Sequence, residues 1–208
     1  MKYTFRLSRR SLTKQGENDP VVIVSGLPRC GTSMMMQMLA AGGIPIVTDH
    51  IRKPDQDNPR GYYEYEKVKQ IKKDASWIKK CRGKTFKMVS ALLYYLPQNE
   101  RFKVIFMQRD MNEMLASQDA MLQRLERKTD DSSNAEMLDR FQKHIREVEK
   151  WLEEQKNIEV IYIRHNEVIQ GPHECAKLVS RFLEDKLDTV RMAGVIEKPL
   201  YRNRRVTK

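Results

Sequence analysis

The segment from Val21 to Met34 combines two glycines, an arginine and two hydroxyl side chains in a spacing that suits anion binding. The β-branched run at its start predicts a buried strand that ends at Gly26. Gly26 and Gly31 frame four residues, and a helical pattern opens at Thr32 and Ser33. A glycine-bearing loop between a strand and a helix directs backbone N–H groups and the partial positive charge of the helix at one point. The spacing therefore predicts a phosphate site.

The loop departs from the pattern of nucleotide-hydrolysing proteins at one position. In those proteins a lysine follows the second glycine and reaches the terminal phosphates. Here that position holds Thr32, and the cation of the loop is Arg29. This difference argues against hydrolysis of ATP or GTP and favours another phosphate-bearing ligand. Thr32 and Ser33 would donate hydrogen bonds to it or would cap the helix, and both roles are compatible.

A second block with strand and helix character lies further along the chain. Lys103–Met107 reads as a buried strand, and Gln108 and Arg109 follow it. Asp110 and Glu113 form a capping box that predicts a helix start. Ser117 stands eight residues after Arg109. The spacing by itself does not indicate that Arg109 and Ser117 meet one ligand.

Together the two blocks resemble those of the sulfotransferases, which move a sulfuryl group from 3′-phosphoadenosine 5′-phosphosulfate (PAPS) to a hydroxyl or an amine. The resemblance covers about Pro20 to Arg202. It implies that PAPS is the co-substrate, that adenosine 3′,5′-bisphosphate (PAP) is the product, and that no metal takes part. The resemblance suggests that the loop residues Pro28, Arg29, Cys30, Gly31, Thr32 and Ser33 bind the 5′-phosphosulfate and that Arg109 and Ser117 bind the 3′-phosphate. It also suggests that Tyr201 and Arg202 lie near the nucleotide. For Tyr201 and Arg202 a solvated basic tail is the alternative, and Cys30 is interpreted as a small loop filler.

The resemblance also suggests which residues assist the transfer. Charge grows on the leaving phosphate oxygen, so a cation must lie there, and Arg29 is placed to supply it. Because arginine is a poor proton donor, its role would be electrostatic. Lys87 corresponds to a strand-end lysine that steadies the sulfuryl group in cytosolic relatives, with an edge-strand lysine as the alternative. The histidine base of those relatives is missing from the run Lys87-Met88-Val89.

The acceptor hydroxyl still needs a base. Relatives that lack the histidine often place a glutamate in the part of the chain that corresponds to residues 58–66, and we select Glu64 as the base. Glu66 is an alternative, although a helix-start acid that complements the helix dipole explains it equally well. Asp49 and His50, at the end of an expected strand, are the other candidates.

Strand and helix patterns alternate along the chain, which predicts a single α/β domain with a central, mostly parallel sheet flanked by helices on both faces. We assign residues 20–208 to this domain and residues 1–19 to a flexible or edge-strand segment. The expected strands are Val21–Ser25, Ile44–Val47, Thr85–Val89, Lys103–Met107 and Ile158–Ile163. The expected helices are Thr32–Ala41, Glu66–Lys80, one that begins after Asp110, a long one that opens at Ser133, and Cys175–Leu183.

Bulk composition limits the classes of partner. The 208 residues carry 39 Lys and Arg against 28 Asp and Glu, a formal net charge of +11, which favours polyanionic ligands. No nucleic-acid motif accompanies this charge, so no nucleic-acid partner is expected. The three cysteines have no metal-ligand spacing and suggest a reducing compartment. Since no apolar run is long enough for a membrane span, we expect a cytoplasmic enzyme, with a targeting segment in residues 1–19 as the alternative.

The acceptor is expected to be a small molecule or a carbohydrate. Two other functions remain open. One is a phosphate-loop kinase-like phosphotransferase, against which the missing loop lysine argues, as does the lack of an aspartate closing Val104–Met107 for a magnesium ion. The other is a non-catalytic module that binds a nucleotide or a polyanion.

Overall fold

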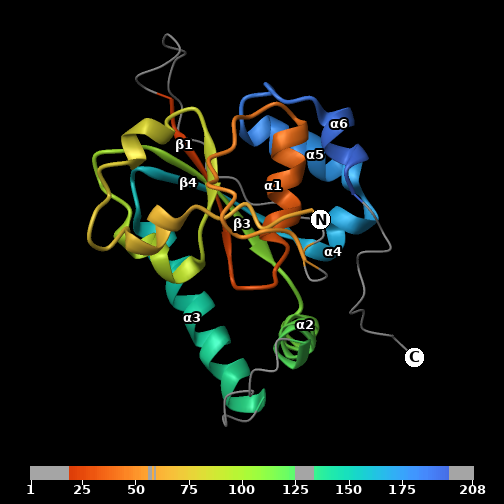
Figure 1. Cartoon of the computed structure of the whole chain (residues 1–208). Helices are drawn as coiled ribbons and strands as arrows, with labels where there is room; N and C mark the ends of the chain where they lie inside the picture. Colours follow the sequence, from red (N-terminus) through yellow and green to blue (C-terminus); the bar gives the residue numbers. More distant parts are fainter. Residues whose placement is uncertain (1–18, 56–57, 59, 125–133, 197–208) are drawn as a thin grey trace.

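The computed structural model describes residues 19–55, 58, 60–124 and 134–196, which form a parallel sheet with helices on both faces (Figure 1). Its strands are β1 (Val21–Gly26), β2 (Thr85–Lys87), β3 (Phe102–Gln108) and β4 (Ile158–Arg164). They lie in the order β2-β1-β3-β4, and every neighbouring pair is parallel. The predicted α/β class is confirmed, and these four strands match four of the five expected ones to within a few residues.

One face of the sheet is covered by α1 (Thr32–Ala41), α4 (His165–Gln170), α5 (Pro172–Phe182) and α6 (Thr189–Gly194) (Figure 1). Val22 and Val24 of β1 point to this face, because alternate residues of a strand face opposite sides. They belong to a buried cluster with the α1 residues Met35, Met36, Met38 and Leu39. Methionine suits this position since its unbranched thioether fills irregular gaps. This packing fixes α1 against the sheet, directly behind the loop that precedes it.

The other face is covered by three short 3-10 helices and one long α-helix. They are η1 (Glu66–Gln70), η2 (Ile78–Cys81), η3 (Ser90–Tyr95) and α3 (Asn134–Glu154). Val21 and Ile23 of β1 face this side and pack in a second cluster with Val148 and Leu152 of α3. The apolar residues of α3 recur every three or four positions, so one stripe of this helix meets the core.

Two expected elements are wrong. The helix expected over Glu66–Lys80 is replaced by η1 and η2, because Asp74 Oδ1 accepts the N–H of Ser76 at 2.8 Å and such local hydrogen bonds compete with helical ones. The strand expected over Ile44–Val47 is reduced to an isolated bridge between Ile46 and Thr85. Pro45 contributes a carbonyl oxygen to Thr85 but has no N–H to donate.

Two helices were not expected at all, and some expected features cannot be located. The helices α4 and α6 have six residues each, too few for a helical periodicity to stand out. The N-terminal edge strand expected within residues 1–19 falls almost entirely outside the described residues, as does Ser133, where the long helix was expected to open.

The carboxyl ends of the four strands meet at one edge of the sheet. Gly26 pairs with Met107, Met107 with Ile163, and Val24 with Lys87. The helix α2 (Met111–Arg124) follows β3 at this edge (Figure 1). Ligands of open parallel sheets bind at this edge, and the candidates Arg29, Lys87 and Arg109 stand at or just beyond these strand ends.

Candidate functional site

The loop from Leu27 to Gly31 connects β1 to the first turn of α1. The loop contains a tight turn, because the N–H of Cys30 donates to the carbonyl oxygen of Leu27 at 3.3 Å. Gly31 immediately precedes the helix and has no side chain with which to cap it. The N–H groups of the first helical turn, beginning at Thr32, therefore remain suited to an anion, which the helix dipole also favours.

Close packing explains both glycines of the loop. A Cβ on Gly26 would lie 2.5 Å from the carbonyl oxygen of Met107 in the adjacent strand. A Cβ on Gly31 would lie 2.5 Å from Cδ2 of His165, and Gly31 has a φ of +91°, which strains any residue with a side chain. The imidazole of His165 thus forms part of the wall behind the loop, although no sequence motif points to this histidine.

The two blocks found in the sequence meet at Arg29. Nε of Arg29 donates to Oγ of Ser117 at 3.1 Å, and Nη1 of Arg109 donates to the carbonyl oxygen of Arg29 at 3.1 Å. Arg29 has a φ of +67°, a conformation that non-glycine residues adopt at a cost and that often occurs at functional sites. The fold therefore brings Arg29, Arg109 and Ser117 together at the edge of the sheet.

Arg109 is held from two sides. Its Nε lies 3.3 Å from Oε2 of Glu113, and the side chains of both residues are nearly buried. Asp110 Oδ1 accepts the N–H groups of Asn112 and Glu113, so the predicted cap of α2 is present. The cap sets the first turn of α2, and that turn holds Glu113 against the guanidinium.

Burial and the charge of Arg109 tune two titratable groups beside the loop. Burial lowers the pKa of His165 to about 4; Arg109 lowers this pKa further, and Glu113 partly offsets the shift. Burial raises the pKa of the Cys30 thiol to about 12, and Arg109 offsets this only in part. At pH 7 the imidazole is therefore neutral and Cys30 is a thiol. This agrees with the interpretation of Cys30 as a loop filler, because the thiolate is the nucleophilic form of cysteine.

Lys87 reaches the same loop from the end of β2. Its Nζ donates to Oγ of Ser33 at 3.2 Å and lies 3.9 Å from Oε1 of Glu64. Burial lowers the pKa of Lys87 to about 8; Glu64 opposes this shift, while Arg52 and Arg29 add to it. The ammonium group is thus a cation at neutral pH that loses its proton far more readily than an exposed lysine does.

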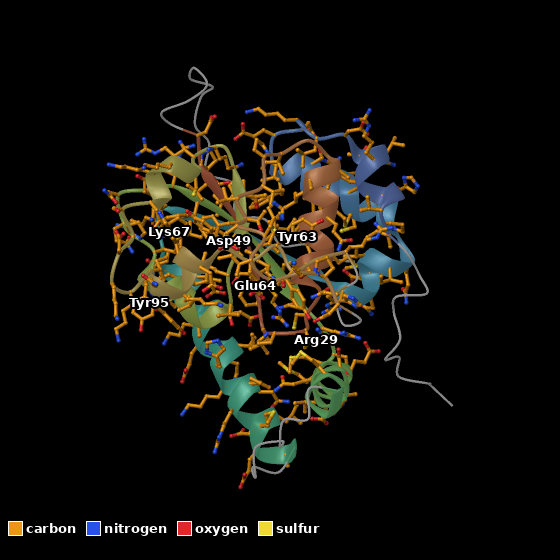
Figure 2. The ribbon with its side chains drawn as sticks, in the orientation of Figure 1. Arg29, Asp49, Tyr63, Glu64, Lys67 and Tyr95 are labelled. Carbon is orange, nitrogen blue, oxygen red and sulfur yellow. The ribbon has the colours of Figure 1, made fainter. Side chains whose placement is uncertain are left out.

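Glu64, labelled in Figure 2, comes from the segment between α1 and η1. Thr48 Oγ1 and the N–H of Asp49 donate to the backbone carbonyl of Glu64, at 2.9 and 3.2 Å. Its carboxylate accepts a hydrogen bond from Nη1 of Arg52 at 3.1 Å. The backbone and the carboxylate of Glu64 are therefore both fixed, and the carboxylate lies beside Lys87.

The alternatives to Glu64 have other contacts. Asp49 accepts the N–H groups of Glu66 and Ile51, and these hydrogen bonds, that to Glu66 foremost, lower the pKa of Asp49. Glu66 begins η1 and pairs with Lys69 at 2.6 Å, as expected for a helix-start acid. His50 is exposed and has a φ of +56°.

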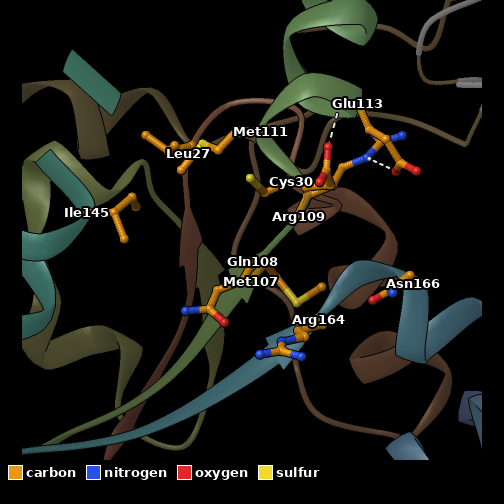
Figure 3. A pocket seen from close by; sticks show the side chains of 11 residues that line it. Leu27, Cys30, Met107, Gln108, Arg109, Met111, Glu113, Ile145, Arg164 and Asn166 are labelled. Carbon is orange, nitrogen blue, oxygen red and sulfur yellow. Dashed lines mark hydrogen bonds and ion pairs between the residues drawn. The ribbon is translucent and has the colours of Figure 1, made fainter. Parts of the chain in front are cut away.

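A cavity of about 410 Å³ opens beside the loop (Figure 3). Leu27, Cys30 and Met107 give it an apolar wall, while Arg109 and Asn166 belong to its polar lining. Its volume is in the range of small-molecule sites. Since Cys30 and Arg109 line both this cavity and the phosphate loop, a ligand can extend from one into the other.

Of the remaining candidates, Pro28 is exposed at the turn of the loop, while Tyr201 and Arg202 lie outside the described residues. Four residues at the site had no signal in the sequence. They are His165, Asn166, Arg52 and Tyr62, whose ring stacks against the guanidinium of Arg52. Arg52 lies beside Lys53 in a segment of mixed charge, and only the folded structure distinguishes it from its neighbours.

Comparisons with known proteins bear on the identity of the chain. No curated protein matches it. Among solved structures, a sulfotransferase from Alicyclobacillus acidocaldarius superposes with a TM-score of 0.47 at 16% identity, over 87% of each chain. In the part of the chain that the structure describes, no helix has the length and apolar character to cross a bilayer. The sequence model of the family described as "Sulfotransferase domain" matches residues 19–206, nearly the whole chain. The chain therefore belongs to the sulfotransferase family and is a transferase.

Proposed function

We propose that the protein transfers a sulfuryl group from PAPS to a hydroxyl or amine of a small-molecule or carbohydrate acceptor. One observation carries the choice of donor: Arg29 contacts both Ser117 and Arg109. The predicted 5′-phosphosulfate loop and the predicted 3′-phosphate residues therefore form one continuous basic site. A nucleotide with phosphate groups on both sides of its ribose fits this arrangement better than a singly phosphorylated one.

The residues present fit such a donor. The N-terminus of α1, which Gly31 precedes without a side-chain cap, would receive the 5′-phosphate. Arg109 and Ser117 would bind the 3′-phosphate, and the adjoining cavity of about 410 Å³ has room for the nucleoside. Thr32 and Ser33 would add hydroxyl donors. When bound, PAPS supplies the sulfuryl group, whose bond to the 5′-phosphate oxygen breaks as a bond to the acceptor forms.

Two cations of this chain would stabilise the leaving phosphate and the transferring group. Arg29 supplies a fixed positive charge, because a guanidinium keeps its proton. Lys87 lies at the end of β2, where it donates to Ser33 in the first turn of α1. Preorganised cations at the point where charge develops lower the barrier more than equally strong contacts to the ground state.

Glu64 would accept the proton that the acceptor hydroxyl loses. Its carboxylate lies 3.9 Å from the ammonium of Lys87, so base and sulfuryl-binding cation are adjacent. An acceptor placed between Glu64 and the loop would have its proton and its attacking oxygen in suitable positions. The acceptor would then lie over Thr48 and Glu64, at the mouth of the site.

Binding and turnover measurements test this function. PAP should raise the melting temperature more than ADP does, and more than ATP with or without magnesium, because a ligand stabilises the state that binds it. Incubation with ³⁵S-labelled PAPS and a panel of acceptors should yield labelled product. A larger shift with ATP and magnesium would favour the kinase-like function. PAP binding without transfer to any acceptor would favour a non-catalytic binding module.

A further inference from the structure

Arg52 is one contact further from the phosphate loop than Glu64. The contacts run from Oγ of Ser33 to Nζ of Lys87, from there to Oε1 of Glu64, and from the same Oε1 to Nη1 of Arg52. The exposed fraction of the side chain rises along this path, from 13% for Lys87 to 24% for Glu64 and 41% for Arg52. Arg52 thus stands where the site opens to solvent, next to the group that we propose as base.

The guanidinium of Arg52 is held in a defined orientation. Its Cζ lies 3.3 Å from the centroid of the Tyr62 ring, a cation–π stack. Tyr62 is itself fixed, since its hydroxyl donates to the carboxylate of Asp55 and its carbonyl accepts from Ser33. Tyr62 is also buried, with 3% of its surface exposed. An exposed arginine on such a support loses little side-chain entropy when it binds a ligand.

The stack on Tyr62 and the ion pair with Glu64 leave N–H donors of Arg52 for a ligand. A guanidinium carries five N–H donors in a planar fork, of which the contact with Glu64 uses Nη1. Within the described part of the chain, Glu64 is the carboxylate that contacts Arg52. One face of the guanidinium rests on the ring, but its edge can still form the paired hydrogen bonds that suit a carboxylate or a sulfate.

The surroundings of Arg52 also favour an anion. Lys69 is a second cation close by, since its charge interacts with those of both Glu64 and Arg52. The nearby acids are already engaged, Asp49 with backbone N–H groups and Glu66 with Lys69. A neutral acceptor would leave the remaining N–H donors of Arg52 hydrogen-bonded to water. An anionic acceptor would accept charge-assisted hydrogen bonds from them.

We propose that Arg52 is a specificity residue that binds an anionic group, a carboxylate or a sulfate, next to the hydroxyl that receives the sulfuryl group. This inference rests on the proposed function, in which Glu64 accepts the hydroxyl proton. The acceptor anion would use the N–H donors of Arg52 that the contact with Glu64 leaves. Binding of the correct acceptor therefore sets its hydroxyl beside the carboxylate of Glu64.

The test compares matched acceptors that differ in one charge. A carboxylate pair is 3-hydroxybenzoate and its methyl ester, and a sulfonate pair is 3-hydroxybenzenesulfonate and the corresponding sulfonamide. Binding to the PAP-saturated enzyme by calorimetry and kcat/KM with labelled PAPS are measured for each. The anionic member should be favoured by at least about tenfold, as expected for charge-assisted hydrogen bonds. The stronger of the two pairs identifies carboxylate or sulfonate, which serves as the analogue of a sulfate, as the preferred group.

Two variants of Arg52 and one control variant test whether Arg52 causes the preference for the anionic acceptor. Arg52→Ala should bring the ratio between anionic and neutral members close to one, chiefly through KM. Arg52→Lys should restore it only in part, because lysine offers no planar fork. Lys53→Ala removes the same charge from an adjacent exposed position and should keep the ratio.

Several results would overturn the inference. They are equal binding of both members by the wild type, binding of neither member, a preference that survives in Arg52→Ala, and equal losses in Arg52→Ala and Lys53→Ala. Equal use of charged and neutral acceptors would leave sulfuryl transfer itself intact. Failure of PAP to bind would instead overturn the proposed function, so the two failures can be told apart.

Discussion

Nε of Arg29 lies 3.1 Å from Oγ of Ser117, so the loop after β1 meets the second turn of α2 across 88 positions of sequence. Arg109 reaches the same place and donates to the carbonyl oxygen of Arg29. The contact matters because it joins two sets of anion donors that would otherwise be separate sites. A ligand bound to both sets is held at two points, and each point can be removed by mutation.

The first prediction concerns Arg109. Arg109→Ala should weaken PAP binding by at least about tenfold, because a charge-assisted contact to the 3′-phosphate is lost. Adenosine 5′-phosphosulfate, which lacks that phosphate, should lose much less affinity. Isothermal titration with both ligands measures the difference.

Arg191→Ala is the matched control for Arg109→Ala. Arg191 lies on α6, is largely exposed and pairs with Asp188, so its loss should change neither affinity. Equal losses for both ligands in Arg109→Ala would assign this arginine a structural role through its hydrogen bond to Arg29.

The second prediction concerns the pH dependence of transfer. Burial lowers the pKa of Lys87 to about 8, so the cation is present below that pH and lost above it. The kcat/KM for PAPS, which reports groups of the free enzyme, should therefore decline as pH rises above about 8. Initial rates between pH 6 and 10 at low PAPS measure this decline.

Lys87→Arg separates this cause from others. Arginine keeps its proton over the whole range, so the alkaline decline should disappear even if the maximal rate falls. An unchanged decline in Lys87→Arg would assign the titration to a different group.

The central architecture was accessible from the sequence because its signals are local and strong. Buried β-branched runs such as Val21–Val24 and Lys103–Met107 predict parallel strands, and the capping box at Asp110 located a helix start. Two weaker elements were predicted wrongly because one residue in each prevents the regular hydrogen-bond pattern. Pro45 interrupts the expected second strand, and Asp74 interrupts the helix expected over Glu66–Lys80.

The site residues that could be predicted are those that stand at or just beyond the end of a strand in the sequence. Arg29, Lys87 and Arg109 stand at or just beyond strand ends, so topology alone brings them to one edge. His165 and Arg52 were not predictable. The role of His165 depends on its ring lying against Gly31, and that of Arg52 on a stack with Tyr62, and neither contact leaves a pattern in the sequence.

The third prediction concerns His165 and acid stability. Burial lowers the pKa of His165 to about 4, whereas an unfolded chain would show the ordinary value of 6.5. Between these values the unfolded state binds more protons, so the free energy of unfolding falls as pH drops from 6.5 to 4. The contribution of this one group is on the order of 3 kcal/mol and is fully present above pH 6.5.

Urea unfolding at pH 7, 5.5 and 4.5 measures this contribution. The wild type should lose more stability between these values than His165→Gln does, since glutamine does not titrate. His173→Gln, which changes an exposed histidine of α5, should behave as the wild type. Parallel pH profiles for all three proteins would show that His165 does not titrate in this manner.

The fourth prediction concerns the base. Glu64→Gln keeps the shape and the hydrogen-bond acceptor that Arg52 contacts but removes basicity, so PAP affinity should stay near normal while kcat falls by ~10²–10⁴-fold. Glu66→Gln should be mild, because an exposed acid in a first helical turn contributes only ~0.3–1 kcal/mol. Single-turnover transfer with labelled PAPS, together with PAP binding, separates the effect on catalysis from the effect on nucleotide affinity.

If Glu66→Gln were the slower enzyme, the base would be Glu66. If both were nearly as fast as the wild type, proton acceptance would fall to His50 or Asp49, and the pairing of Glu64 with Lys87 would serve only to hold the lysine in place.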